Sequence, residues 1–184
     1  DRCLSRGLGD VYKRQLLIDT TIEHGLPTAD LLLFALPGVG DVGKNAIEML
    51  NESSQAERVA RFIHPGLAPL ARLDEDGLLA PPHLYASLFT TPTGQRVMTV
   101  TGPGQPSDPS HQYDFTQELL EAFSKVDLPE MLVLAGLSSP PEKKEAFVVA
   151  SSSAHRVDME ERGVDVRRDQ PSGGAIGMSA LMAS

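Results

Sequence analysis

Six successive apolar residues at positions 31–36 form the clearest hydrophobic pattern in this chain. The run does not alternate between apolar and polar positions, so it suits a parallel strand that helices cover on both faces. Beyond a glycine-rich turn, apolar side chains recur at helical spacing. This spacing predicts a helix over residues 41–51 with Asp41 at its N-cap. Strand, turn and helix together indicate an α/β fold.

Shorter apolar patterns predict three more strands in the middle of the chain. A strand at 59–63 is followed by a long proline-containing loop at 64–83. A loop of this length in a compact domain is either functional or a covering lid. Residues 84–90 and 96–101 alternate in character and flank a Pro-Thr-Gly turn, which predicts a hairpin.

A second strong helical pattern covers residues 114–126. Asp114 and Gln117 are placed as a capping box at its start. Its predicted buried stripe contains Phe115, Leu119, Ala122, Phe123 and Val126. Two buried strands are predicted after it, at 131–137 and 146–150, and a helix follows at 154–162.

The turn after the first strand carries the clearest chemical motif. Gly38, Gly40 and Gly43 meet the G-x-G-x-x-G spacing of dinucleotide-binding turns. Lys44 almost completes a P-loop, but Asn45 stands where a hydroxyl should ligate magnesium.

The dinucleotide motif also lacks the acidic residue that normally accompanies it. Its ribose-binding carboxylate should follow the second strand, whereas Glu57 precedes that strand. The Asp41 carboxylate would further occupy the positive helix end that an anion needs. We therefore interpret the turn as a tight structural connection. The alternative is a ligand-binding site at Gly38, Gly40, Gly43 and Lys44.

The remaining candidate residues do not form a strong catalytic or metal motif. Ser151 to Ser153 lie near His155 without a G-x-S-x-G context, so we interpret them as helix caps. Asp74 begins like a calcium loop, yet Tyr85 stands where its twelfth-position glutamate belongs. The five histidines show no ligand spacing. We expect no catalytic residue, no metal and no cofactor.

Composition narrows the class of protein. The 184 residues, 41% hydrophobic and 22% charged, suit one globular domain. No apolar run approaches the ~20 residues of a membrane helix, and no signal-peptide pattern is present. These features predict a soluble, cytoplasmic protein.

Both ends of the chain look atypical. Residues 1–15 have no periodicity and resemble translated sequencing-adaptor sequence, so we expect a scar outside a single α/β domain at 16–184. Without them, 12 basic and 23 acidic residues leave a net charge of −11, and the only cysteine, Cys3, is gone. Such an acidic surface disfavours nucleic acid and membranes as partners. The last residues begin like a glycine-headed helix without a final cap, which predicts truncation at the C-terminus.

Four segments, taken in order, resemble the proteasome assembly chaperone family, the archaeal and bacterial relatives of the eukaryotic assembly chaperones. They are LLLFALPGVGDVGK at 31–44, with Pro37 ahead of the glycines; Gln105 and Pro106 ahead of a helix; MLVLAGL at 131–137; and GGAIGMSAL at 173–181. The resemblance implies a three-layer αβα fold with a mixed, mostly parallel sheet, similar to the purine nucleoside phosphorylase and hydrolase class. It also implies self-association and binding to proteasome subunits, without established catalytic residues.

Two functional hypotheses follow from these features. The first is a non-enzymatic, homo-oligomeric binding protein of the assembly chaperone type, with proteasome α subunits as partners. The second is an enzyme or sensor on a phosphorylase-like scaffold that binds phosphate, a nucleoside or a nucleotide at the turn from Gly38 to Lys44. The missing halves of both nucleotide motifs favour the first hypothesis.

Overall fold

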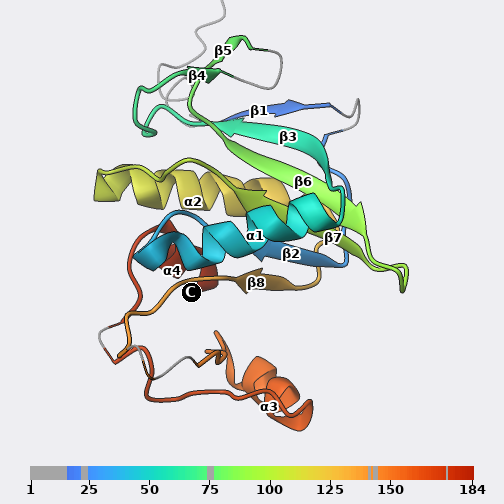
Figure 1. Cartoon of the computed structure of the whole chain (residues 1–184), viewed down its shortest axis with the longest axis vertical. Coiled ribbons are helices and arrows are strands. Elements are labelled where there is room, and N and C mark those ends of the chain that lie inside the picture. Colours follow the sequence, from blue (N-terminus) through green and yellow to red (C-terminus); the bar gives the residue numbers. More distant parts are fainter. Residues whose placement is uncertain (1–15, 22–24, 74–76, 141, 143–144, 173) are drawn as a thin grey trace, which may run out of the picture.

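The structure is a computed structural model that describes residues 16–21, 25–73, 77–140, 142, 145–172 and 174–184. A six-stranded mixed sheet forms its centre, with the strand order β1-β3-β6-β7-β2-β8 (Figure 1). Its strands are β1 (Leu17–Thr20), β2 (Leu31–Phe34), β3 (Glu57–Ile63), β6 (Leu84–Thr90), β7 (Arg96–Thr101) and β8 (Met131–Val133). The helices are α1 (Val42–Ser53), α2 (Pro109–Phe123), α3 (Ser153–Glu161) and α4 (Met178–Ala183), with a short 3-10 turn η1 (Val39–Asp41) before α1.

The sheet combines parallel and antiparallel pairings. β2 runs parallel to its neighbours β7 and β8, whereas β1–β3, β3–β6 and β6–β7 pair antiparallel. The mixed sheet is confirmed, but the expectation of a mostly parallel one is corrected. The loop at 64–83 joins β3 to β6 and a tight turn joins β6 to β7, neither of them with a helix among its described residues, whereas neighbouring parallel strands are usually joined by a crossover helix. β1 adds a third antiparallel pairing that the sequence pattern did not predict.

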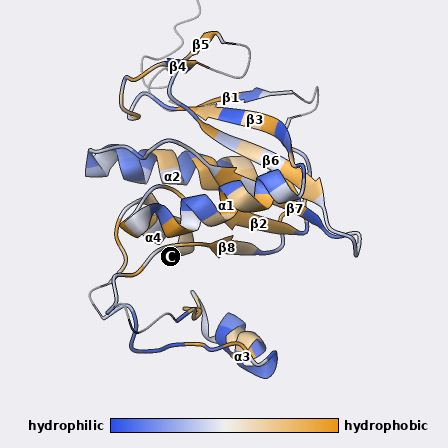
Figure 2. Cartoon of the chain, in the orientation of Figure 1, coloured by the Kyte–Doolittle hydropathy of each residue, from blue (hydrophilic) through white to orange (hydrophobic). Residues whose placement is uncertain are grey.

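Helices pack against both faces of β2, the fifth strand in the order of the six-stranded sheet. Leu32 and Phe34 face one core, which includes side chains of α2 and α4. Leu33 and Ala35 face a second core that contains Ile47 of α1. In Figure 2, β2 is hydrophobic along its whole length, whereas α1 shows both colours. This arrangement confirms that the uniform apolar run forms a strand buried on both faces.

The start of α2 differs from the prediction. Asp108 is its N-cap, where the side chain accepts a hydrogen bond from Ser110 N at 2.8 Å, and Pro109 occupies the first helical position. Proline suits this position because its missing N–H would have no helical partner there. The proposed capping box at Asp114 and Gln117 is therefore wrong, since both residues lie inside the helix. The stripe of Phe115, Leu119, Ala122 and Phe123 is buried as predicted, whereas Val126 follows the helix.

Strand predictions were most accurate for the hairpin. β6 and β7 have the predicted bounds, and β3 covers the predicted strand at 59–63. The strand predicted at 131–137 is limited to β8, and the one at 146–150 is replaced by an isolated bridge between Val148 and Val166. The long loop after β3 contains a small hairpin, β4 (Arg72–Leu73) and β5 (Leu79–Ala80).

The two C-terminal helices, α3 and α4, differ in how they pack against the sheet. α3 begins after Ser152, whose side chain accepts a hydrogen bond from His155 N at 3.1 Å, so the interpretation of a serine cap is confirmed. α3 lies below β8 in Figure 1, apart from the sheet. α4 follows Gly177, as its glycine-headed pattern predicted, and buries Met178 and Met182 in the core shared with α2.

Two sequence predictions concern positions outside the described residues. They are the proposed scar at 1–15 and the acidic turn that starts at Asp74. Among the described residues, no helix combines the length and apolar character that a membrane-spanning segment requires.

Candidate functional site at the carboxyl edge of the sheet

Three family segments that are far apart in sequence leave the sheet at one edge. β2, β7 and β8 are parallel neighbours, so their carboxyl ends lie together. We call the residues that follow these strands, 35–44, 102–106 and 134–137, the carboxyl edge. Ligand sites of open α/β sheets commonly lie at such an edge. It therefore contains the best candidate site of the described chain.

The glycine-rich turn is closed by its own backbone and by Asp41. The N–H of Gly38 donates to Asp41 Oδ1 at 3.2 Å, and the N–H of Asp41 donates to the carbonyl of Gly38 at 3.1 Å. Asp41 precedes α1 as predicted, but its backbone is left-handed, with φ of 51°, and its carboxylate points back to Gly38 rather than into the helix. The N–H of Gly38 thus has an internal acceptor.

Close backbone packing explains why a glycine stands at position 43. A side chain there would collide with the carbonyl of Leu134, which follows β8. The relationship is reciprocal, because a side chain at Gly136 would collide with the carbonyl of Val39. Two glycines therefore allow the turn and the segment after β8 to lie in direct contact. The sequence motifs do not identify Gly136 as a site residue, although a glycine inside an apolar strand pattern is typical of close backbone approach.

Lys44 is paired along its own helix. Its Nζ lies 2.8 Å from Glu48 Oε1, one turn further along α1. Both charges act on Tyr85 of β6, where burial and the Glu48 carboxylate raise the pKa of the phenol. Lys44 is thus directed along α1 towards β6, and its ammonium group already has a carboxylate partner.

Gln105 joins the second and fourth family segments to the turn. Its Oε1 accepts a hydrogen bond from the N–H of Met178 at 2.9 Å, at the start of α4. Its Nε2 lies 3.5 Å from the carbonyl of Pro37. The adjacent Pro106 is buried, and its carbonyl accepts a hydrogen bond from Gln112 of α2 at 2.6 Å. All four family segments consequently meet at the carboxyl edge.

Apolar side chains are exposed on the same edge. Val39 and Val42 are 52% and 58% exposed, and Leu137 is 49% exposed. Gly136 lies against both valines, and Leu137 is the next residue along the chain. We call Val39, Val42 and Leu137 the valine patch. Exposed apolar groups that adjoin one another are typical of interaction sites.

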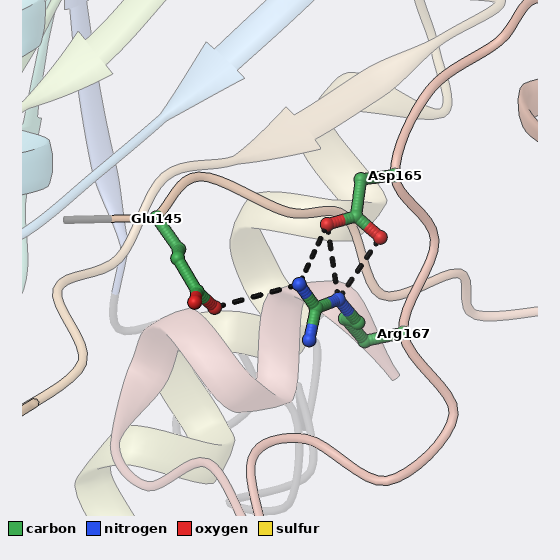
Figure 3. Close-up of polar contacts among 3 residues, drawn as sticks. All are labelled: Glu145, Asp165 and Arg167. Carbon is green, nitrogen blue, oxygen red and sulfur yellow. Dashed lines mark hydrogen bonds and ion pairs between the residues drawn. The ribbon is translucent and has the colours of Figure 1, made fainter. Parts of the chain in front are cut away.

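A second polar cluster lies outside this edge, beside α3. The guanidinium of Arg167 binds Asp165 at 2.8 to 3.0 Å and lies 3.4 Å from Glu145 (Figure 3). These hydrogen bonds lower the pKa of Asp165 and raise the pKa of Arg167. Nearby, Arg168 pairs with Glu160 at 2.8 Å. Because each of these arginines already has a carboxylate partner, the cluster ties the segment around α3 together.

Neither the histidines nor the serines form a reactive centre in the described residues. His155 meets the serines through its backbone N–H, which donates to the Ser152 cap. Within the described ranges, no three His, Cys, Asp or Glu side chains are grouped as a metal site.

The fold and the carboxyl edge define a class: a mixed α/β protein whose glycine-rich turn packs against the segment that follows the edge strand β8. Within this class, the chain belongs to the PAC2 family, whose model matches residues 32–184. The resemblance to the proteasome assembly chaperone family is thereby confirmed.

Several solved structures share this fold. Pyrococcus furiosus PbaB, an archaeal proteasome activator, is 21% identical with a TM-score of 0.74, covering 91% of this chain and 73% of PbaB. Pyrococcus furiosus PbaA, an archaeal homolog of proteasome-assembly chaperone, is 16% identical with a TM-score of 0.68, covering 91% of this chain and 69% of PbaA. A PAC2 family protein from Streptomyces avermitilis is 18% identical with a TM-score of 0.61, covering 83% of this chain and 68% of that protein.

A curated relative is similar in sequence. An uncharacterized protein of Methanocaldococcus jannaschii is 22% identical over 152 residues, which cover 83% of this chain. The match covers 58% of the relative, so this chain spans less than two thirds of that protein's length.

Proposed function

We propose that this protein is a non-enzymatic, homo-oligomeric protein-binding module of the proteasome assembly chaperone type, acting in the cytoplasm. The observation that carries the proposal is the difference between polar and apolar groups at the carboxyl edge. Polar groups of the glycine-rich turn bind one another, whereas the valine patch is exposed.

The internal polar contacts favour protein binding over anion binding. An anion at the turn would need free N–H groups and a free cation. Gly38 N–H donates to Asp41, and Lys44 pairs with Glu48. The Asp41 carboxylate would also repel an anion at the start of α1. Phosphate could bind to these groups only by displacing their partners. The free-energy cost of that displacement disfavours phosphate binding.

The exposed side chains favour a protein partner. Protein interfaces concentrate apolar groups at their centre and charged groups at their rim. The valine patch has this character, with Asp41 beside it. Because Gly136 fixes the segment after β8 against the turn, the patch is held on a rigid support. A preformed apolar surface loses little conformational freedom on binding.

The related proteins suggest the partner. PbaB is an archaeal proteasome activator, and PbaA is an archaeal homolog of proteasome-assembly chaperone. We therefore propose proteasome α subunits as partners of this protein. The proposed similarity to the phosphorylase scaffold concerns the fold, and a shared fold does not determine function.

Binding of purified proteasome α subunits from the same organism tests this proposal. We expect a complex with the wild-type protein, measured by biolayer interferometry, and self-association measured by sedimentation velocity. Val42→Glu should weaken the complex by about tenfold or more, ~1.4 kcal/mol, because it buries a charge in the interface. The change should leave folding intact, since an acidic residue in the first helical turn is favourable.

Met49→Glu is the matched control. Met49 also lies on α1 and is 71% exposed, but it lies two helical turns, ~10 Å, further along the helix from Val42. Its substitution should leave binding unchanged. The proposal is overturned if the wild-type protein binds no α subunit. It is also overturned if Val42→Glu binds the α subunits as tightly as Met49→Glu and the wild type do.

A further inference from the structure

A histidine is buried where the chain leaves β3. His64 directly follows this strand and is only 1% exposed. Its ring stacks on Phe115 of α2, with centroids 4.5 Å apart and an interplanar angle of 8°. A neutral imidazole tolerates such an apolar site, whereas a charged one is disfavoured there.

The two ring nitrogens have different surroundings. Nδ1 accepts a hydrogen bond from the N–H of Gly66 at 3.0 Å, so the proton of the neutral ring belongs on Nε2. Nε2 lies 3.9 Å from Glu118 Oε2 on α2, which is too long for a hydrogen bond. A shift of about 1 Å would bring this pair to the hydrogen-bonding range.

The hydrogen bond to Gly66 closes a tight turn at residues 64–67. The N–H of Leu67 donates to the carbonyl of His64 at 3.1 Å, and Leu67 is buried in the main core. Gly66 is wedged between two histidines, because a Cβ there would lie 2.6 Å from His111 Cβ and 3.0 Å from His64 Nδ1. The turn thus depends on an unprotonated Nδ1 at a position with little free space.

We propose that His64 is a pH-sensitive latch that holds the 64–67 turn against α2 when its ring is neutral and releases the turn when Nδ1 is protonated. Protonation places a ring N–H opposite the N–H of Gly66, and two donors cannot share a hydrogen bond. The new charge is attracted to Glu118. The ring therefore moves from Gly66 towards Glu118, and Leu67 loses its fixed place in the core.

Four influences act on the pKa of His64. Burial lowers the pKa of His64, and it is the largest of them. Glu118 and Asp114 raise the pKa, whereas His111 lowers it, and all three residues lie on α2. Because burial dominates, the closed turn is the form at neutral pH, and acidification below the ordinary histidine range opens it. This inference does not depend on binding to the proteasome.

The wild-type protein provides the first test. NMR of the histidine ring nitrogens and of the Gly66 amide should be followed from pH 8 to pH 4.5. We expect Nδ1 of His64 to lose its acceptor character and the Gly66 amide proton to shift upfield with the same midpoint. The latch is excluded if His64 stays neutral throughout, or if it titrates while the Gly66 amide does not respond.

A single tryptophan can report the mobility of the turn. The chain contains no tryptophan, and Leu70 is 57% exposed three residues beyond Leu67. In a Leu70→Trp protein, fluorescence anisotropy should fall as the pH passes through the His64 midpoint. In Leu70→Trp with His64→Asn, the fall should be absent, because the Asn amide oxygen can accept from Gly66 without titrating.

A persistent fall in the His64→Asn protein would overturn the proposal, since another group would then control the turn. Glu118→Gln provides a second comparison. Loss of the carboxylate removes the attraction that favours the charged ring, so the midpoint of the anisotropy change should move to lower pH. An unchanged or higher midpoint would contradict the role of Glu118.

Discussion

Gln105 and Met178 are 73 residues apart, yet the Gln105 side chain accepts a hydrogen bond from the backbone N–H of Met178 at 2.9 Å. The bond serves the start of α4, where backbone N–H groups have no partner within the helix. The same side chain lies against the carbonyl of Pro37. One amide thus holds α4 against the glycine-rich turn, which explains why these segments belong to one structural unit.

Gln105→Ala should therefore destabilise the protein by about 1–3 kcal/mol, because it removes a hydrogen bond and leaves a partly buried N–H without a partner. Urea unfolding followed by circular dichroism measures this change. Gln117→Ala is the control, since Gln117 lies exposed on α2 and its side chain donates a 3.2 Å hydrogen bond to Glu121 on the same helix. A loss no larger than that of the control would show that Gln105 does not hold α4.

Gly43→Ala should destabilise the protein although alanine is the better helix former. The propensity gain is about 1 kcal/mol. Against it stands a collision between the new Cβ and the backbone of Leu134, which cannot be relieved by a change of rotamer. Overpacking of this kind typically costs about 1–3 kcal/mol. We expect a lower melting temperature for Gly43→Ala.

Gly104→Ala is the matched control for this substitution. Gly104 also belongs to the carboxyl edge, but a Cβ there would meet no atom within 4 Å. Its effect should stay within about 0.5 kcal/mol. A Gly43→Ala protein that melts at or above the wild-type temperature would disprove the close approach of α1 to the segment after β8.

The parts of the fold that depend on local patterns could be predicted from the sequence. The uniform apolar run at β2 and the alternation of β6 and β7 each repeat over enough residues to fix the element type. The buried stripe predicts α2, but the sequence pattern places the start of the helix at residue 114, too late in the chain. Asp108 and Pro109 begin the helix, although proline and aspartate are also common in loops.

Elements that depend on distant partners could not be predicted. β1 has only four residues and gains its place from pairing with β3. Among the described residues, the apolar segment at 146–150 adjoins none of the named strands, and Val148 forms an isolated bridge to Val166. At the candidate site, the sequence identified the glycines and Gln105, but not the contact of Gly136 with Val39, because no local pattern encodes which backbones approach each other.

Phosphate binding separates the two functional hypotheses. A ligand present at 100 times its dissociation constant stabilises the folded state by about 2.7 kcal/mol, which a thermal-shift assay detects. We expect no shift with phosphate, nucleosides or nucleotides, because Lys44 and Gly38 already have internal partners. Lys44→Ala should cost only about 0.3–0.5 kcal/mol, the value typical of an i,i+4 helical ion pair. A clear shift that Lys44→Ala abolishes would establish an anion site at the turn.

The protein should become less stable on acidification because His64 becomes protonated. Burial holds the pKa of His64 in the folded state below 6.5, its ordinary value in an unfolded chain. Between these two pKa values the unfolded state binds more protons, so the free energy of unfolding rises with pH. The contribution of His64 is thus fully present above pH 6.5 and is lost as the pH falls through the folded-state pKa. Urea unfolding between pH 8 and pH 4.5 measures the profile.

His64→Asn removes this titration while keeping an acceptor near Gly66. The variant should be less stable than the wild type at pH 8, because it loses the stacking of the ring on Phe115. The difference should narrow as the pH falls, since only the wild-type protein loses the His64 contribution. His111→Asn controls for the neighbouring histidine, whose ring centroid lies 6.1 Å from that of His64. It removes a group that disfavours the charged form of His64, so the acid loss should persist at a slightly higher pH. Parallel profiles for the wild type and His64→Asn would show that another group causes the acid sensitivity.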